Sequence, residues 1–247
     1  MNALEWHKSA AELAWQVECG VTEAIGESPI NRYEMPAAPE KKAAEPAPAL
    51  IMESDPVAEA EALAAGASSL EALAAAQAGY EHCELKRGAR SFVFSDGVPG
   101  APIMIVGEAP GRDEDREGKP FVGRAGQLLD KMLAAIGRSR SEDVYITNIL
   151  PWRPPQNRDP KPDEVAMMMP FLRRHIALAE PKMLIAMGNH SCGALLGKKG
   201  ITRLRGNWDE ALGLPVLPML HPAYLLRQPH AKRQAWEDLL ALQAHLA

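Results

Sequence analysis

The sequence predicts an α/β protein with three layers (α/β/α), in which helices cover both faces of a central four-stranded, mainly parallel sheet. The first observation is a set of four apolar runs, at residues 102–107, 144–149, 182–187 and 214–219. The second is the helical stretches that alternate with them, at about 125–137, 162–179, 189–197 and 229–246. Near-continuous apolar strands indicate burial on both faces, and a β-α repeat favours parallel pairing.

The first third of the chain has a different composition. Residues 1–33 include a stretch, residues 3 to 18, whose apolar side chains have partly helical spacing and predict a short amphipathic helix: Leu4, Trp6, Leu13, Trp15 and Val17. Residues 34–56 are rich in Pro, Ala and Glu, which is typical of an extended linker. We therefore expect an N-terminal amphipathic helical segment at 1–33, a linker at 34–56 and a folded domain at 57–247.

Within that domain, the stretch from Val57 to Gly79 is dominated by alanine and leucine. Ser68 or Ser69 is suited to cap a helix that begins at Leu70, because a serine hydroxyl accepts a hydrogen bond from a free backbone amide of the first turn.

Composition limits where the protein works. The chain has 247 residues, 47% of them hydrophobic, and contains no run of eighteen apolar residues. Charged side chains interrupt its first fifteen residues, which argues against a signal peptide or a membrane span. Three widely separated cysteines argue against a disulfide framework. We expect a cytoplasmic protein with no membrane contact, and a monomer.

The charges are unevenly distributed. Residues 1 to 81 carry four Lys/Arg against fourteen Asp/Glu, whereas residues 82 to 247 carry twenty-three against eighteen. The modest positive excess of the second part is compatible with a nucleic-acid partner, because basic side chains neutralise phosphates. Many proteins with no such partner share this feature.

Unusual segments follow each predicted strand, and in parallel α/β folds ligands gather at the carboxyl ends of strands. The sequence GEAPGRDEDREGKPFVGRAG runs from Gly107 to Gly126, PWRPPQNRDP follows Ile149, GNHSCG follows Met187 and LHPAYLLR follows Met219. Glycines after a strand bring backbone amides close to an anionic ligand, although such loops also occur as plain tight connections.

Taken in order, these segments resemble the successive motifs of the family 4 uracil-DNA glycosylases over roughly residues 80 to 240. The matching stretches are GEAPGRDEDREGKPFVGRAGQLLD, VYITN with RPPQNRDP, PKMLIAMG and HPAYLLRQP. The resemblance implies hydrolysis of the bond between uracil and deoxyribose in DNA, after the nucleotide is rotated out of the stack, as a step of base excision repair. Residues 1 to 75 lie outside it.

The resemblance also implies roles for individual residues. Phe121 matches the aromatic that stacks on uracil, and Asn148 matches the asparagine that reads O4 and N3–H with its amide. His221 matches the motif histidine, a donor for the negative charge that develops on O2. Glu108 is expected to orient the attacking water, with Asp113, Glu114 and Asp115 as competing carboxylates. Backbone amides are expected from Gly107, Ala109 and Gly111.

Basic residues near these motifs are candidate contacts to the DNA backbone. The set comprises Arg112, Lys119, Arg124, Arg153, Arg158 and Arg227. For Arg227 a surface salt bridge is an alternative, as is filling the space that the flipped base leaves.

The chain departs from the family at its metal site. Family 4 enzymes typically bind a 4Fe-4S cluster through four cysteines, and those positions fall on Tyr80, Cys83, Trp152 and Met168. Because one thiol cannot hold such a cluster, we expect no cofactor and an apolar plug of Tyr80, Trp152 and Met168 instead.

Two rival interpretations remain at this stage. One is a non-catalytic DNA- or nucleotide-binding protein on the same fold, and the other is a polymerase-associated or processivity factor, which rests on the linker at 34–56. Uracil-containing DNA is the expected partner in the main interpretation, together with a possible protein partner for residues 1–33.

Overall fold

The computed structural model describes residues 3–21 and 55–246. The chain divides into two units, one of which contains helix α1 (Ala3–Glu18) while the other contains every further described element. Helix α1 confirms the helix predicted over residues 3 to 18, and it exposes Trp6, Leu13, Trp15 and Val17. Of the predicted linker, residues 34–54 lie outside the described residues, and Asp55 and Pro56 cap and open the next helix.

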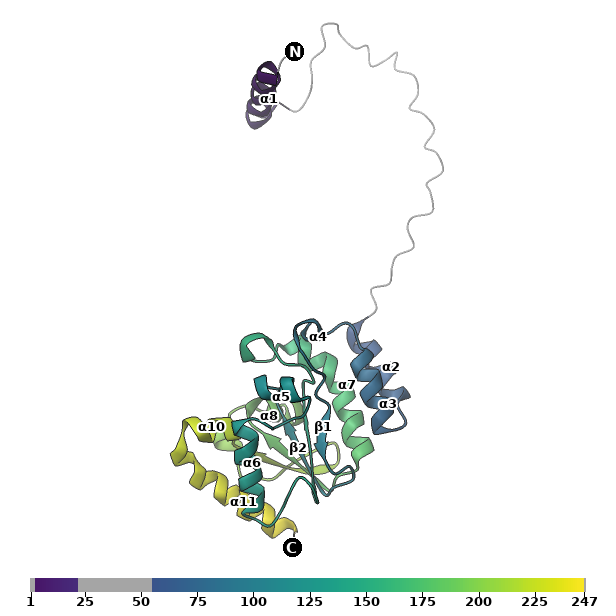
Figure 1. Ribbon diagram of the computed structural model, residues 1–247, viewed down its shortest axis with the longest axis vertical. Coiled ribbons are helices and arrows are strands. Elements are labelled where there is room, and N and C mark those ends of the chain that lie inside the picture. The colour runs from purple at the N-terminus through teal and green to yellow at the C-terminus, as the bar shows by residue number, and fades with distance from the viewer. Residues whose placement is uncertain (1–2, 22–54, 247) are drawn as a thin grey trace. The chain divides into compact units, whose positions relative to one another are not determined.

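The second unit is a three-layer α/β/α body (Figure 1). Its sheet has six strands in the order β1-β3-β2-β4-β6-β5. The strands are β1 Ser95–Gly97, β2 Ile103–Gly107, β3 Val144–Asn148, β4 Met183–Met187, β5 Asp209–Ala211 and β6 Leu214–Met219. The helices are α2 Pro56–Gly66, α3 Leu70–Gly79, α4 Leu85–Gly88, α5 Arg112–Glu117, α6 Arg124–Ala134, α7 Pro162–Ala179, α8 Asn189–Leu196, α9 Ile201–Leu204, α10 Pro222–Arg227 and α11 Lys232–Leu246, with 3-10 turns η1 Pro155–Asn157 and η2 Pro229–Ala231.

The four predicted strands are confirmed as β2, β3, β4 and β6, and they pair with one another in parallel. The predicted number of four strands is too low, because β1 and β5 add an antiparallel strand at each edge. Each of these edge strands has three residues, SDG and DEA, and neither contains an apolar run. Strands that short and polar carry no periodic signal, so only pairing with a neighbouring strand reveals them.

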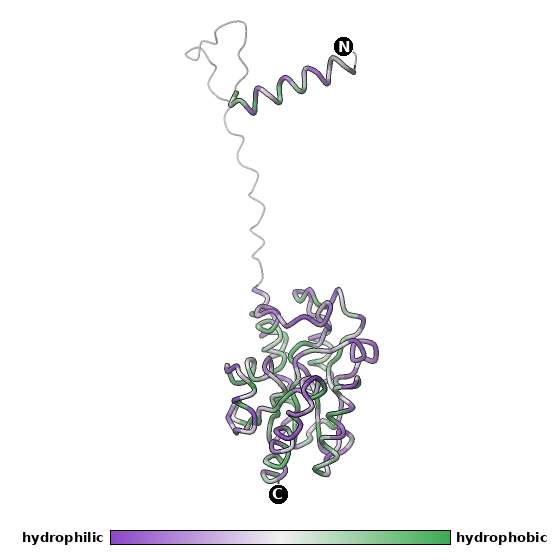
Figure 2. The backbone as a smooth tube through the Cα atoms, turned by 90° about the vertical axis from the view of Figure 1, so that its left-hand side faces the viewer, coloured by the Kyte–Doolittle hydropathy of each residue, from purple (hydrophilic) through white to green (hydrophobic). Residues whose placement is uncertain are grey.

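Side chains of the central strands alternate between two cores. Ile103 and Ile105 pack with α6, α10 and α11, whereas Met104 and Val106 pack with α2, α3, α7 and α8. Figure 2 shows hydrophobic segments gathered inside this body. Ser69 caps α3 as predicted, since its hydroxyl accepts from the Ala72 amide at 3.2 Å. Among the described residues, no helix combines the length and apolar character needed to cross a membrane.

The four positions that match the family's cluster ligands lie in one buried apolar cluster. Tyr80, Cys83, Trp152 and Met168 are each at most 3% exposed. The Tyr80 hydroxyl donates to the Pro56 carbonyl at 2.7 Å, and burial raises the pKa of Tyr80 to about 12. Burial also raises the pKa of the Cys83 thiol, which favours its protonated form. A phenol, an indole, a thioether and one protonated thiol do not fit an iron–sulfur cluster, which needs thiolates.

His175 of α7 is buried beside Tyr145 and Phe94. Its Nε2 lies 2.9 Å from the Tyr145 hydroxyl, and its ring stacks on Phe94 with centroids 4.2 Å apart. Burial lowers the pKa of His175 to about 3 from an ordinary value of 6.5. The unfolded chain therefore takes up a proton at a higher pH than the folded protein does, so stability is lost as the pH falls from about 6.5 toward 3.

We expect this residue to account for part of the acid sensitivity of the protein. In His175→Gln, which keeps a polar group opposite Tyr145, the free energy of unfolding should be lower at pH 7 but fall less steeply between pH 7 and pH 4 than in the wild type. Denaturant titrations at several pH values measure this. An equal slope in both proteins would assign the acid sensitivity to other groups.

Candidate functional site

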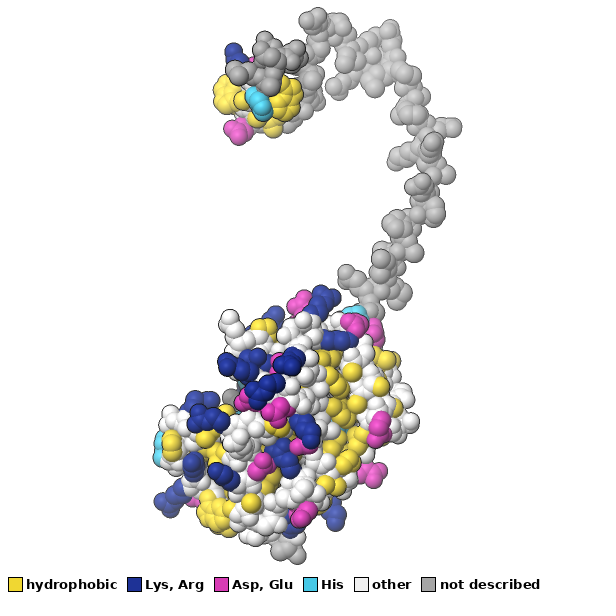
Figure 3. Space-filling model, in the orientation of Figure 1, with side chains coloured by type: hydrophobic (Ala, Val, Ile, Leu, Met, Phe, Trp, Pro, Cys, Tyr) yellow, Lys and Arg dark blue, Asp and Glu magenta, His cyan; other side chains and the backbone are white. Residues whose placement is uncertain are grey.

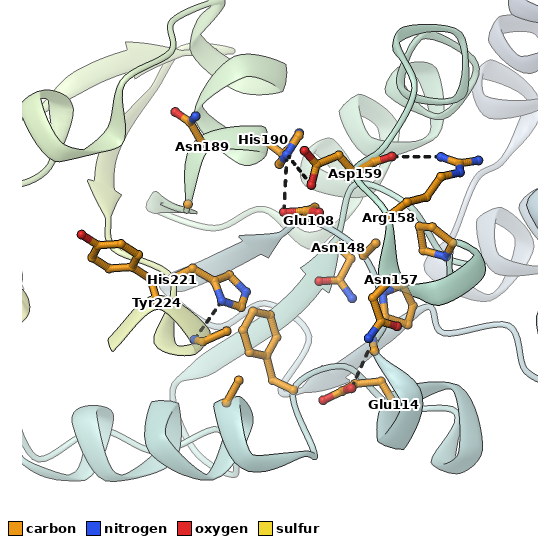
Figure 4. Close-up of a pocket in the computed structure, with 18 of the residues that line it drawn as sticks. Glu108, Glu114, Asn148, Asn157, Arg158, Asp159, Asn189, His190, His221 and Tyr224 are labelled. Atoms are coloured by element: carbon orange, nitrogen blue, oxygen red, sulfur yellow. Dashed lines mark hydrogen bonds and ion pairs between the residues drawn. The ribbon is translucent and has the colours of Figure 1, made fainter. Parts of the chain in front are cut away.

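The carboxyl ends of the parallel strands meet around a cavity of about 500 Å³ (Figure 4). Gly107 at the end of β2 pairs in register with Asn148 at the end of β3. Asn148 lines the cavity, whereas Gly107, predicted to contribute to the site, does not. Of the residues predicted from the sequence, those that line the cavity are Glu108, Ala109, Gly111, Glu114, Phe121, Asn148, Arg158, His221 and Arg227. The topology explains this convergence, because parallel strands end at the same edge of the sheet.

Asn148 has an unusual environment. Its side chain is 6% exposed, and neither its amide nitrogen nor its amide oxygen has a hydrogen-bond partner. Among the side chains of the described residues, these two are the only nitrogen and oxygen atoms that are buried without a hydrogen-bond partner. Buried polar groups are nearly always paired, so an unpaired amide at the floor of a cavity marks a place where a ligand completes the hydrogen bonds.

Gly107 leaves room for this amide. A Cβ at this position would lie 2.3 Å from the Asn148 amide oxygen and 2.6 Å from the Phe121 ring. Any larger residue would therefore push into the space between the amide and the aromatic ring. Glycine is therefore required at position 107, because the Asn148 amide and the Phe121 ring leave no room for a side chain.

Phe121 is held in a strained backbone conformation. Its φ is +53°, in the left-handed region of backbone conformations that residues other than glycine rarely adopt. Arg140 stabilises it by donating from Nη2 to the Phe121 carbonyl at 2.7 Å and from Nη1 to the Pro120 carbonyl at 3.2 Å. Arg140 was not predicted as a site residue, because nothing in its local sequence connects it to a loop about twenty residues earlier.

Gly126 in the first turn of α6 packs directly on this strained residue. A Cβ there would lie 1.7 Å from the Phe121 carbonyl oxygen and 2.0 Å from its carbon. These are backbone atoms, so no side-chain rotation relieves the clash. We expect Gly126→Ala to lower the free energy of unfolding by about 2 kcal/mol, the cost of overpacking a tight site.

Gly66→Ala is the matched control, because a Cβ at Gly66 meets no atom within 4 Å. Chemical denaturation of the two variants and the wild type measures the difference. A Gly126→Ala protein as stable as the Gly66→Ala protein would contradict the close packing of α6 on Phe121.

Backbone amides of the glycine-rich loop donate hydrogen bonds to a carboxylate of the same loop, that of Glu114. Glu114 accepts hydrogen bonds from the amides of Gly111, Val122 and Gly123 at 3.1, 3.0 and 2.9 Å. Asp115 accepts from the amides of Arg90 and Ser91 at 2.8 and 3.1 Å. Glu114 and Asp115, two of the three alternatives to Glu108 as the water-orienting carboxylate, therefore bind backbone amides instead. The Gly111 amide, which was expected to contact a ligand, already donates to Glu114.

His221 lies beside Phe121, with ring centroids 5.4 Å apart and planes 30° apart. Its Nδ1 accepts from the Ala223 amide at 3.1 Å. Burial, followed by the positive charge of Arg227, lowers the pKa of His221 to about 4, so the ring is neutral at pH 7. Because Nδ1 is an acceptor in a neutral ring, Nε2 carries the proton and is the donor that remains free.

Glu108 contributes a carboxylate to the cavity. Burial raises the pKa of Glu108, His190 lowers it and Asp159 raises it further. His190 Nε2 lies 3.8 Å from a Glu108 carboxylate oxygen and 3.7 Å from one of Asp159 (Figure 4). The cavity is also lined by four residues that were not predicted as site residues: Asp159, Asn189, His190 and Tyr224. All four stand in segments that follow strand ends, which is the signal that pointed to this edge.

The six basic residues predicted to contact the DNA backbone differ in exposure and in the partners that they bind. Arg227 lines the cavity and is exposed, and Arg112 and Arg124 are exposed at the first positions of α5 and α6. Lys119 pairs with Asp96 at 3.4 Å. Arg153 donates to the Asn157 side chain at 2.7 Å, and Arg158 forms a two-pronged pair with Glu164. Figure 3 shows Lys and Arg side chains gathered over the region of α5 and α10.

Comparisons with known proteins identify a family for this chain. The profile of the Uracil DNA glycosylase superfamily matches residues 94–240. The Type-4 uracil-DNA glycosylase of Sulfurisphaera tokodaii is 40% identical over 165 residues, covering 63% of this chain and 75% of the relative. The Type-4 uracil-DNA glycosylase of Saccharolobus solfataricus is 38% identical, covering 68% of this chain and 82% of the relative. That of Thermotoga maritima is 43% identical, covering 59% of this chain and 77% of the relative.

Proposed function

Since this chain belongs to the uracil DNA glycosylase superfamily, we propose that it is a monofunctional DNA glycosylase that releases uracil from DNA and thereby begins base excision repair. The observation that carries this proposal is the unpaired amide of Asn148 at the cavity floor. An amide offers one donor and one acceptor side by side, which complements O4 and N3–H of uracil, whereas cytosine presents the opposite pattern.

The neighbouring residues support a hydrolytic role for the cavity. The bond between uracil N1 and deoxyribose C1′ breaks, and the negative charge of the leaving base collects on O2. The oxygen of water bonds to C1′, and the proton that this water loses neutralises the released uracil anion. The free Nε2–H of neutral His221 is suited to donate to O2, and Glu108 is suited to accept a hydrogen bond from the attacking water. Phe121 supplies the flat face for a flipped pyrimidine.

The experiment uses the full chain and a uracil-containing oligonucleotide. Incubation followed by alkali, which cleaves abasic sites, should yield strand breaks at uracil and none in the matched oligonucleotide with cytosine at that position. Single- and double-stranded forms are assayed in parallel. Binding without any cleavage at stoichiometric protein would favour the rival interpretation, a non-catalytic DNA-binding or polymerase-associated protein.

We further propose that the domain binds no iron–sulfur cluster, because the donor set at Tyr80, Cys83, Trp152 and Met168 does not fit one. Iron and acid-labile sulfide analysis of the purified protein tests this, and four irons per chain would contradict it. Phosphate contacts by the exposed Arg112, Arg124 and Arg227, a monomeric state, a cytoplasmic location and a protein partner for residues 1–33 stay predictions.

A further inference from the structure

Three side chains from separate segments converge at one side of the cavity. Glu108 follows β2, Asp159 lies between η1 and α7, and His190 is the second residue of α8. His190 Nε2 stands nearly equidistant from the two carboxylates, at 3.8 and 3.7 Å. The imidazole therefore bridges a carboxylate inside the cavity and one on the loop at its rim, as Figure 4 shows.

The backbone of Glu108 is fixed, but its carboxylate depends on this bridge. The Glu108 carbonyl accepts from the Leu150 amide at 3.1 Å, which extends the pairing of β2 with β3 past the end of the strands. Within the described part of the chain, His190 is the only basic side chain close enough to form an ion pair with Glu108. The side chain of Glu108 is about one third exposed, so without a partner several rotamers are open to it.

His190 itself is placed by rigid surroundings. Gly188, which precedes α8, has a φ of +95°, and its amide donates to the Met219 carbonyl at 2.9 Å. The Asn189 side chain accepts from the amides of Gly200 and Ile201 at 2.8 and 3.2 Å. Both residues before His190 are thus fixed, which directs the imidazole toward the cavity.

Asp159 is held from the other side. The guanidinium of Arg158 donates to the Asp159 carbonyl at 2.9 Å while it pairs with both carboxylate oxygens of Glu164. Glu164 is buried at the start of α7 and also accepts from the Lys161 amide at 2.9 Å. Arg158, predicted from the sequence as a phosphate contact, anchors this loop.

We propose that His190 and Asp159 are positioning residues for Glu108: the imidazole, which lies between the two carboxylates, holds the Glu108 carboxylate in its water-orienting rotamer. The inference rests on the proposed function, because it assigns Glu108 the water. His190 acts through Glu108 and needs no contact with the base.

The charges of His190 and Asp159 act on Glu108 in opposite directions. Burial raises the pKa of Glu108, a protonated His190 lowers it, and the negative charge of Asp159 raises it. Removing His190 therefore raises that pKa, and removing Asp159 lowers it. The other titratable or charged side chains that line the cavity are Glu114 from α5, Arg158 from the loop, and His221, Tyr224 and Arg227 from α10 and its cap.

The first experiment measures single-turnover uracil release against pH in wild type, His190→Gln and Asp159→Asn. Glu108 must be ionised to accept from water, so activity falls on the acid side as its carboxyl protonates. We expect the acid limb to move to higher pH in His190→Gln and to lower pH in Asp159→Asn. We also expect an about tenfold fall in rate at the plateau for His190→Gln, from the misplaced carboxylate, with DNA affinity unchanged.

His230→Gln is the matched control, since His230 is exposed in η2 and does not line the cavity. Its profile should coincide with that of the wild type. Coincident acid limbs for wild type and His190→Gln would overturn the proposal, as would shifts of the same sign in the two cavity variants.

A second measurement does not need activity. The carboxyl carbon of Glu108, assigned with Glu108→Gln, is titrated by ¹³C NMR in the same variants. The Glu108 midpoint should rise in His190→Gln and fall in Asp159→Asn. If the wild type releases no uracil yet these midpoints move as expected, the glycosylase proposal fails while the electrostatic bridge stands. If the midpoints do not move, the bridge fails whatever the activity.

Discussion

Replacing Asn148 by alanine is expected to lower uracil release by about 100-fold or more while the melting temperature of the protein stays unchanged or rises. The amide is buried without a partner in the free protein, so its removal takes no hydrogen bond from the fold. In the complex with a flipped uracil, the same removal leaves O4 and N3–H of the base unpaired, and unpaired buried polar groups cost about 1–3 kcal/mol each. Single-turnover kinetics and thermal unfolding measure the two effects.

Asn148→Asp tests the pattern of donor and acceptor more narrowly. An ionised carboxylate accepts but does not donate, so it repels O4 of uracil while it keeps the shape of the side chain. We expect uracil release to fall as far as in Asn148→Ala. Asn207→Asp, an exposed asparagine outside the cavity, is the control and should behave like the wild type. Unchanged activity in Asn148→Asp would remove Asn148 from base recognition.

The second large effect is expected at His221. In His221→Ala the donor for the developing charge on O2 is lost, and removing one such donor costs about 3 kcal/mol, which is on the order of 100-fold in rate. The loss should fall on the chemical step, with little change in DNA binding. Single-turnover rates at saturating and subsaturating protein separate the two.

The pH dependence of this variant gives a further check. Because the pKa of His221 is lowered to about 4, its ring is neutral over the range from about pH 5 upward, and the wild-type rate should show no limb from His221 there. The ratio of wild-type to His221→Ala rates should therefore stay constant between pH 5 and pH 8. A ratio that falls as the pH rises through 6 to 7 would show that the imidazolium is the active form, and would contradict the tautomer inferred from the Ala223 contact.

The regular elements could be predicted because their signals are local. Four apolar runs become β2, β3, β4 and β6, and amphipathic or capped stretches become α3, α6, α7, α8 and α11. The edge strands β1 and β5 could not be predicted, because a segment of three residues without an apolar run becomes a strand only when a neighbouring strand supplies the hydrogen bonds. The resemblance of the motifs located Glu108, Phe121, Asn148 and His221, and the cavity brings these four together.

Other features of the site depend on contacts between distant segments. The sequence indicated amides around an anion at residues 107–126, but that anion is the carboxylate of Glu114 within the same loop. Arg140 and Gly126 support the strained Phe121 from positions with no motif of their own. His190 and Asp159 are separated by thirty-one positions along the chain and are joined by the edge of the sheet.

The order and spacing of apolar runs, glycines and motif residues were sufficient for the fold class, the family and the edge of the sheet where ligands bind, because each depends on a few neighbouring positions. Packing of helices and loops across that edge decided that Glu114 pairs with backbone amides while Glu108 faces the cavity. It also decided which nitrogen of His221 keeps its proton, and it left the Asn148 amide unpaired. Those properties arise from burial and from hydrogen bonds between segments far apart in the chain, and they exist only once the strands are side by side.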